Sequence, residues 1–377
     1  MPALGTSPAP HAHCSEEIKK HVNIPVATVA RINEPWVAEE LIENDKCDMC
    51  MIGRANLCDS EFANKAFEGK TDDIRPCIGC GRCLTGIMMG KRISCTVNPS
   101  VEDDTVEKAT EKKKVLVIGG GPAGMEAAYV AHQRGHEVVL CEKSNELGGQ
   151  LRIAAVPIAK QELCRVIKYM KRRLDNAGIE VRLNTEVTEE MLNNEFKDYE
   201  IICSCGAISK EIPPFEIFKN CMTADEVLSG SKYPGRNIVV LGGGSVGCET
   251  ADFLAPLIND LFPMNRKVTI LEMTNSLMPG EGGAAKSRLT QRLMQNGVNI
   301  EMSAQVTKVD ENTITYVKNG VEHVINDADT LIFAVGYIPK KIEINSDKVH
   351  YIGDCAGERP SNIDHAIKSA YDAACEI

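Results

Sequence analysis

The sequence predicts an α/β protein with two parallel-sheet domains, and three observations lead to this expectation. An apolar run that enters a glycine-rich turn occurs twice, at residues 115–124 and 238–247. Each turn is followed by a helical segment and by a second apolar run that ends near a glutamate. A shorter strand–helix–strand pattern lies near the start, at residues 24–52. Repeated units of this kind are typical of parallel sheets covered by helices.

The composition of the 377-residue chain excludes several classes of protein. A net charge of −11 argues against a nucleic-acid-binding protein, which would carry a basic face. No apolar run is long enough to span a membrane, and the first residues lack an export signal. The 16 cysteines are mostly dispersed, which does not resemble a disulfide scaffold. We therefore expect reduced thiols and a cytoplasmic location.

The first glycine-rich turn has the spacing of a Rossmann-like dinucleotide site. Its G-x-G-x-x-G glycines are Gly119, Gly121 and Gly124. Such glycines allow a tight turn, close approach of the backbone to a pyrophosphate, and close packing of helix on strand. The next apolar run, residues 137–140, leads to Glu142, which is placed to accept a hydrogen bond from a ribose hydroxyl. The whole pattern predicts dinucleotide binding.

The second turn repeats this design and indicates which nicotinamide cofactor is preferred. Its glycines are Gly242, Gly244 and Gly247. The following strand ends at Glu272, whose carboxylate would accept from a 2′-hydroxyl and repel a 2′-phosphate. No arginine or lysine comes directly after it. The sequence therefore predicts NAD(H) over NADP(H), with a glycine turn that binds no ligand as the alternative.

Four cysteines cluster within 19 residues ahead of the first glycine turn. They have C-x2-C-x2-C-x11-C spacing and are Cys77, Cys80, Cys83 and Cys95. Structural zinc usually uses two CxxC pairs, whereas ferredoxin-like runs begin with this triplet. The pattern favours a [4Fe–4S] cluster; zinc and no metal remain as alternatives.

Residues 111–377 resemble the flavoproteins with two dinucleotide-binding domains, the glutathione- and thioredoxin-reductase-like group. The matching segments are ELGGQL (146–151), NTEVT (184–188), IICSCGA (201–207), DTLIFAVGYIP (329–339) and YIGDC (351–355). The resemblance implies that the first turn binds FAD, that the second binds NAD(H), and that 329–339 returns the chain to the FAD domain. The implied FAD contacts are Gly119, Gly121, Gly124, Glu142, Lys143, Gly149, Gln150, Val187, Gly206, Gly353 and Asp354. The implied NAD contacts are Gly242, Gly244, Gly247, Glu272 and Gly336.

Some cysteines depart from that pattern. The segment just before the second turn, residues 218–237, holds only Cys221, so the dithiol mechanism of thioredoxin reductases is not expected. Cys205 stands where the group has a threonine, and Cys203 shares its face of the strand. We expect both to be small packing residues.

Residues 15–377 are similar to the C-terminal part of the multidomain old-yellow-enzyme group. That group includes 2,4-dienoyl-CoA reductases, 2-enoate reductases, bile-acid-inducible reductases and trimethylamine dehydrogenase. The resemblance implies that residues 24–52 hold the last two strands of a TIM barrel that carries FMN, and residues 47–52 are expected to form a buried strand. Because two strands cannot complete a barrel, we also expect an apolar surface to be left on residues 24–30 and 47–52. Gly53 and Arg54 match the FMN phosphate contacts, and Ala30 stands where the group often has glycine. Cys47 and Cys50 are expected on a core strand, and Cys58 at the surface or an interface.

The implied domains are a barrel remnant (1–76), a cluster segment with linker (77–110), an FAD domain (111–220 and 328–377) and an inserted NAD(H) domain (221–327). The implied function passes electrons from NADH through FAD and the cluster to FMN, which would reduce an enoate or enoyl-CoA double bond or oxidise an amine. Because two strands cannot close a barrel, we expect a partner chain or second copy to be needed. The alternatives are a reductase subunit for a separate chain and an inactive fragment. The sequence names no catalytic residue, because the group's substrate pocket lies in the earlier barrel strands.

Overall fold

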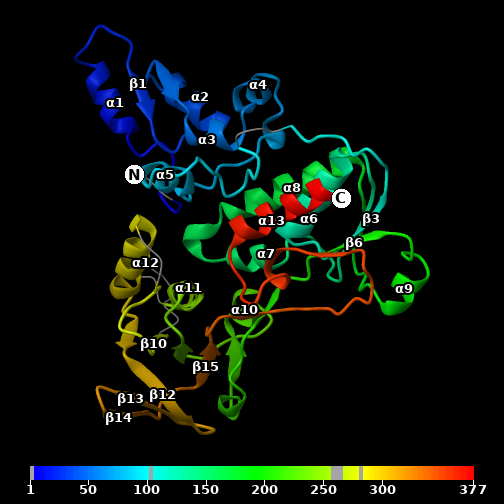
Figure 1. The fold of residues 1–377 in the computed structure, drawn as a ribbon. Coiled ribbons are helices and arrows are strands. Elements are labelled where there is room, and N and C mark those ends of the chain that lie inside the picture. Colours follow the sequence, from blue (N-terminus) through cyan, green and yellow to red (C-terminus); the bar gives the residue numbers. More distant parts are fainter. Residues whose placement is uncertain (1–3, 102–104, 256–265, 280–282) are drawn as a thin grey trace. The chain divides into compact units, whose positions relative to one another are not determined.

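The computed structural model describes residues 4–101, 105–255, 266–279 and 283–377 (Figure 1). Contacts divide the chain into two compact units. The first comprises Met1–Ala155, Ala159–Ala207 and Pro339–Ile377, and the second Val156–Ile158 and Ile208–Ile338. The chain leaves the first unit at β7 (Ala207–Ser209) and returns at β16 (Tyr337–Pro339).

The first unit contains a five-stranded parallel sheet in the order β17-β6-β3-β4-β5. Its strands are β3 (Lys114–Ile118), β4 (Glu137–Cys141), β5 (Glu180–Arg182), β6 (Glu200–Cys203) and β17 (Val349–Tyr351). Val115, Leu116 and Val117 are all 0% exposed, because helices or loops cover both faces of this central strand. Helix α6 (Pro122–Gln133) packs against both α8 (Leu163–Ala177) and α13 (Ile363–Glu376). Shorter helices of this unit are α7 (Gln150–Ala154), α9 (Glu189–Asn193), η2 (Ile158–Lys160, whose first residue belongs to the second unit) and η4 (Gly353–Cys355).

The predicted strand–helix–strand unit is present near the start of the chain. Strands β1 (Ala27–Val29) and β2 (Met49–Met51) pair in parallel around α2 (Pro35–Glu43). The apolar surface expected on these two strands is confirmed, because Val29 is 51% exposed and Met51 60% exposed. Only the expectation that residues 47–52 form a buried strand is wrong. The Val29 and Met51 side chains lie next to each other on one face of the two-stranded sheet, and no element among the described residues covers that face. Whether this unit belongs to a barrel stays a prediction.

The cysteine segment that follows shares its core with the large sheet. Cys77, Ile78 and Val97 belong to the same apolar cluster as Val115 of β3. A polar contact adds to this packing, because Arg75 Nε donates to the Tyr169 hydroxyl of α8 at 3.2 Å. The helices of this region are α1 (Ala12–Lys19), α3 (Arg54–Cys58), α4 (Phe62–Phe67), η1 (Thr71–Asp73) and α5 (Arg82–Met88). The segment is therefore built into the first unit.

The second unit has its own five-stranded parallel sheet, in the order β11-β10-β9-β15-β8. Its strands are β8 (Cys221–Thr223), β9 (Asn237–Leu241), β10 (Lys267–Glu272), β11 (Asn299–Met302) and β15 (Thr330–Phe333). An antiparallel meander adds β12 (Ala304–Val309), β13 (Ile314–Lys318) and β14 (Val321–Ile325). The helices are α10 (Ala224–Leu228), α11 (Ser245–Leu254), α12 (Gly283–Gln295) and η3 (Pro213–Phe215).

One segment lies in a different sheet from the one that the resemblance implies. Strand β15 was expected to return the chain to the first sheet. It instead pairs with β9 and β8 of the second sheet, because its four residues, all buried, complete that apolar core. The return occurs only after this strand, at Pro339.

Candidate functional site

The first glycine turn connects β3 to α6, and its geometry requires glycine at two places. Gly119 has φ of +103°, and a Cβ there would lie 2.6 Å from the Ser204 carbonyl oxygen. A Cβ on Gly124 would lie 1.9 Å from the Gly119 carbonyl oxygen. Gly121, by contrast, has nothing within 4 Å of its Cβ direction and caps the N-terminus of α6. The turn is therefore closed on the protein side and open at the helix N-terminus, where a phosphate binds.

Glu142 follows β4 and is held by the same turn. One carboxylate oxygen accepts from the backbone N–H of Gly120 at 2.6 Å. The other accepts from the backbone N–H of Ser144 at 2.8 Å. The side chain is only 8% exposed, so its orientation is fixed. An ionised carboxylate has about four acceptor positions, which leaves room for a ribose hydroxyl.

Several other predicted FAD contacts lie against this turn. Gly149 has φ of +50°, and a Cβ there would lie 3.0 Å from the Gly121 Cα. Gln150 Nε2 donates to the Ala207 carbonyl at 3.1 Å, next to Gly206. A Cβ on Gly353 would lie 3.1 Å from the Ala123 Cβ. The structure thus brings together segments that are far apart in the sequence.

The remaining predicted FAD contacts are Lys143, Val187 and Asp354. Asp354 accepts from the Ser361 N–H at 2.8 Å, and Val187 packs beside the core at the sheet's other face. Lys143 lies beside Lys340, whose pKa is lowered by burial and then by the Lys143 ammonium group. Two adjacent cations favour an anionic ligand. Sequence reasoning missed Lys340. This residue follows the second unit in the sequence, and only the folded chain brings it close to Lys143 in the first unit.

The second glycine turn makes the same kinds of hydrogen bond and steric contact as the first. Glu272 accepts from the Gly243 N–H at 2.6 Å and from the Thr274 N–H at 2.7 Å. A Cβ on Gly247 would lie 1.9 Å from the Gly242 carbonyl oxygen, whereas one on Gly244 would meet nothing within 4 Å. The predicted contact Gly336 has φ of +101° and is also open. Both turns therefore have the form that a dinucleotide requires.

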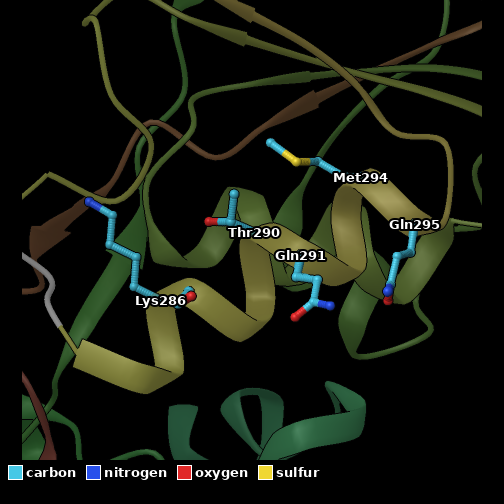
Figure 2. Close-up of a pocket in the computed structure, with 6 residues that line it drawn as sticks. Lys286, Thr290, Gln291, Met294 and Gln295 are labelled. Carbon is cyan, nitrogen blue, oxygen red and sulfur yellow. The ribbon is translucent and has the colours of Figure 1, made fainter.

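A lysine that sequence reasoning missed lies near this second turn. Lys286 comes from α12, and its Nζ donates to the Met278 carbonyl at 3.1 Å. It lies at one end of a shallow hollow along α12 that ends at Gln295 (Figure 2). All six residues lining this hollow belong to α12, and none belongs to the glycine turn. The hollow therefore does not belong to the second glycine turn.

We expect NADH to reduce the protein's flavin faster than NADPH, because Glu272 repels a 2′-phosphate. A hydrogen bond to a charged group contributes roughly 1.5–3 kcal/mol, so the preference should be about tenfold to a hundredfold. Glu272→Arg should narrow or invert it, whereas Glu322→Arg on the exposed strand β14 should not. Stopped-flow rates with both cofactors measure this. An NADPH preference in the unmodified protein would contradict the assignment.

The four clustered cysteines line one small cavity. It is also lined by Arg54, Leu57, Ile78, Gly79, Gly81, Thr96 and Val97. Cys77 and Cys83 are each 8% exposed, Cys95 is partly buried and Cys80 is exposed. No three histidine, cysteine or carboxylate side chains within the described residues are placed to hold a single metal ion. Tetrahedral zinc would bring its sulfur ligands to roughly 3.8 Å from one another. Four cysteine thiolates are also the donor set that a [4Fe–4S] cluster takes.

Backbone N–H groups point at the sulfur atoms of this cavity. Cys95 accepts from the N–H groups of Val97 and Asn98. Its pKa is lowered to about 6, chiefly because the Cys58 thiol donates to it. Such donors stabilise a thiolate, the form in which cysteine binds metal. Cys58 itself was expected at the surface, which is wrong: it is 0% exposed, because the end of α3 packs into the core beside Cys77.

The predicted phosphate contacts lie next to the cysteine cavity. Arg54 lines it; burial raises the pKa of the Cys77 thiol to about 11 and also raises the pKa of Cys83, and the Arg54 guanidinium offsets part of both shifts. Gly53 has nothing within 4 Å of its Cβ direction. Ala30 has φ of +93°, a conformation that favours glycine, the residue that the resemblance places there. Binding of a phosphate by Gly53 and Arg54 stays a prediction.

The model of the pyridine nucleotide-disulphide oxidoreductase family matches residues 113–351. The chain belongs to this family. Its two parallel sheets, each with a glycine turn, confirm the predicted dinucleotide-binding fold, and the family and the relatives support the binding of FAD and NAD(H). No helix in the described part of the chain is long and apolar enough to cross a bilayer.

The relatives agree with the resemblance to the multidomain old-yellow-enzyme group. The chain is 36% identical over 390 residues to bilirubin reductase of Mediterraneibacter gnavus, covering 99% of this chain and 58% of that protein. It is 33% identical over 375 residues to cinnamate reductase of Clostridium sporogenes, covering 96% and 55%. A solved 2-naphthoyl-CoA reductase complex superposes with a TM-score of 0.91 at 25% identity, covering 100% and 57%. The chain therefore spans little more than half the length of these proteins.

Proposed function

We propose that the chain is the NADH-oxidising part of a flavin and iron–sulfur reductase. The observation that carries this proposal is the cysteine cavity, which shares a core with the sheet of the first glycine turn. In the proposed protein the first unit holds FAD and the cluster, and the second unit holds NAD(H). Bound FAD would accept a hydride and release single electrons, which a [4Fe–4S] cluster carries onward.

The chain's own residues would bind and orient these groups. Glu142 and the open N-terminus of α6 would hold the ribose and pyrophosphate of FAD, and Lys143 with Lys340 would add positive charge. Glu272 and the N-terminus of α11 would do the same for NADH. Thiolates of the four cavity cysteines would ligate the cluster, with Arg54 and the N–H groups of Val97 and Asn98 stabilising their negative charge.

The exposed face of β1 and β2 supports a role for further β/α units. Val29 and Met51 form an apolar strip on strands whose edges are also open. Apolar sheet faces of this kind are normally covered, and the relatives are longer proteins. We propose that this face packs against additional barrel units and that Gly53 and Arg54 hold the phosphate of FMN there.

The substrate proposal comes from the relatives. Bilirubin, cinnamate and 2-naphthoyl-CoA are all conjugated organic molecules, so we propose that the complete enzyme reduces an activated C=C bond of the enoate or enoyl-CoA type. A second candidate is an electron-transfer subunit for a separate barrel chain, which the uncovered strands favour equally.

The test compares two activities of this chain on one preparation. We expect NADH-dependent reduction of an artificial dye, because both glycine turns are intact. We expect no reduction of cinnamate and no FMN among the extracted flavins, because two strands provide no walls for a flavin ring. Stoichiometric FMN together with cinnamate reduction would contradict the proposal that further barrel units supply the FMN site. Absence of dye reduction would contradict the assignment of the NADH site.

A surface variant tests the exposed face. Met51→Lys should reduce self-association of the chain, because it interrupts the apolar strip that drives association. Met294→Lys, at a 66% exposed methionine of α12, is the matched control and should change nothing. Light scattering over a concentration series measures the mass. Equal self-association of both variants would contradict the proposal that the apolar face of β1 and β2 drives association.

A further inference from the structure

Three thiols outside the cysteine cavity meet in the first unit. Cys203 ends β6, Cys205 lies in the turn that follows, and Cys355 lies in η4. The Sγ atoms of Cys203 and Cys205 are 3.6 Å apart. Cys355 Sγ lies 3.2 Å from the Cys203 carbonyl oxygen, to which it donates. Cys203 and Cys205 were expected only to be small packing residues, yet their two sulfur atoms are in contact.

The turn that contains this pair is hydrogen-bonded to the first glycine turn. The Ser204 hydroxyl has one proton to donate and shares it between the carbonyl oxygens of Ile118 at 2.9 Å and Gly119 at 2.8 Å. Lys340 N–H donates to the Gly206 carbonyl at 2.9 Å. A change in the conformation of residues 203–206 would therefore move the turn to which we assign the FAD pyrophosphate.

The two thiols differ in the ways that matter for oxidation. Cys203 is 0% exposed, whereas Cys205 is partly exposed, so only Cys205 is open to a small oxidant. The pKa of Cys205 is lowered, chiefly because the Cys203 thiol donates to its sulfur, and the Lys340 ammonium adds to the effect. The thiolate is the form that reacts with oxidants. Cys203 keeps its proton until its neighbour has reacted.

We infer that Cys203 and Cys205 are a redox-active pair, which a peroxide converts to a disulfide and whose oxidation loosens FAD. In the first step the Cys205 thiolate attacks hydrogen peroxide; an S–O bond forms, the O–O bond breaks, and the leaving hydroxide takes a proton to become water. In the second step Cys203 Sγ attacks this sulfur; the S–S bond forms, the S–O bond breaks, and a second water leaves with the Cys203 proton.

In the proposed oxidation, disulfide formation displaces the residue between the two cysteines. A disulfide needs an S–S distance of about 2.05 Å, whereas the sulfurs are now 3.6 Å apart. Closing this gap pulls Ser204 away from its two carbonyl partners. The glycine turn then loses the contacts that hold it against β6, which is the expected cause of weaker FAD binding.

Peptide mapping of the flavin-loaded protein tests the pair directly. Trypsin releases residues 198–210, a peptide with Cys203 and Cys205 and no other cysteine, and residues 349–368, with Cys355 alone. After hydrogen peroxide and alkylation, the first peptide should be lighter by two hydrogen atoms and unalkylated, while Cys355 is alkylated. Free alkylation of both Cys203 and Cys205, or a link to Cys355, would overturn the assignment.

Three variants connect the chemistry to FAD. In Cys203→Ser, oxidation should stop at a Cys205 sulfenic acid that dimedone traps. Peroxide should release FAD from the unmodified protein and from Cys164→Ser, a change at an exposed thiol elsewhere, but not from Cys205→Ser. FAD content is measured before and after peroxide for each. Equal peroxide-induced FAD release from Cys205→Ser and Cys164→Ser would show that the pair does not control flavin binding.

Discussion

Cys83→Ala is expected to lower the iron content from about four atoms per chain to near zero while FAD remains bound. Cys83 is a nearly buried thiol that lines the cavity with the other three cysteines, so no solvent ligand can easily replace it. FAD should remain, because Glu142 and the first glycine turn are held together by hydrogen bonds that do not involve Cys83. Iron assay and flavin extraction on anaerobically purified protein measure both.

The matched control for this variant is Cys164→Ala. Cys164 is an exposed thiol on α8, outside the cavity, so its loss should leave iron unchanged. Full iron retention in Cys83→Ala would refute the ligand assignment. Equal iron loss in Cys164→Ala would show that the assay reports general instability instead.

Gly247→Ala is expected to abolish reduction by NADH. The added Cβ would lie 1.9 Å from the Gly242 carbonyl oxygen, a backbone atom that cannot move without opening the turn. FAD and iron should stay at normal levels, because they are assigned to the first unit. Dithionite should therefore still bleach the flavin of this variant. NADH-dependent bleaching at the unmodified rate would contradict the assignment of the second turn.

Gly244→Ala separates a folding defect from a binding defect at the same turn. Its Cβ meets no protein atom within 4 Å, so the turn should form normally. The methyl group would occupy the space that a pyrophosphate needs, which should raise the KM for NADH. A Gly244→Ala protein with unaltered KM would indicate that no phosphate approaches this turn.

The features that could be predicted from the sequence are those whose signals are local. Both glycine turns and their glutamates lie within short strand–helix–strand segments, and the steric demands on Gly124 and Gly247 follow from that local geometry. The four cysteines lie within 19 residues, so their common cavity needed no long-range information.

The features that sequence reasoning missed depend on contacts between distant segments. Lys340 reaches Lys143 only because the chain returns to the first unit after the second sheet. Cys58 was misplaced because nothing in its neighbourhood indicates that it packs against Cys95. The expectation that residues 47–52 form a buried strand was wrong for a related reason. An apolar run indicates that a strand can pack against another layer, but the described residues include no layer that covers β2.

The most direct test of the account is whether electrons from NADH reach the cysteine cavity. Anaerobic protein is titrated with NADH and followed by low-temperature EPR, with dithionite as the reference reductant. We expect NADH to produce the signal of a reduced [4Fe–4S] cluster in the unmodified protein, and Gly247→Ala to produce it only with dithionite. A protein in which NADH bleaches the flavin while the cluster signal appears only with dithionite would contradict the proposed electron path.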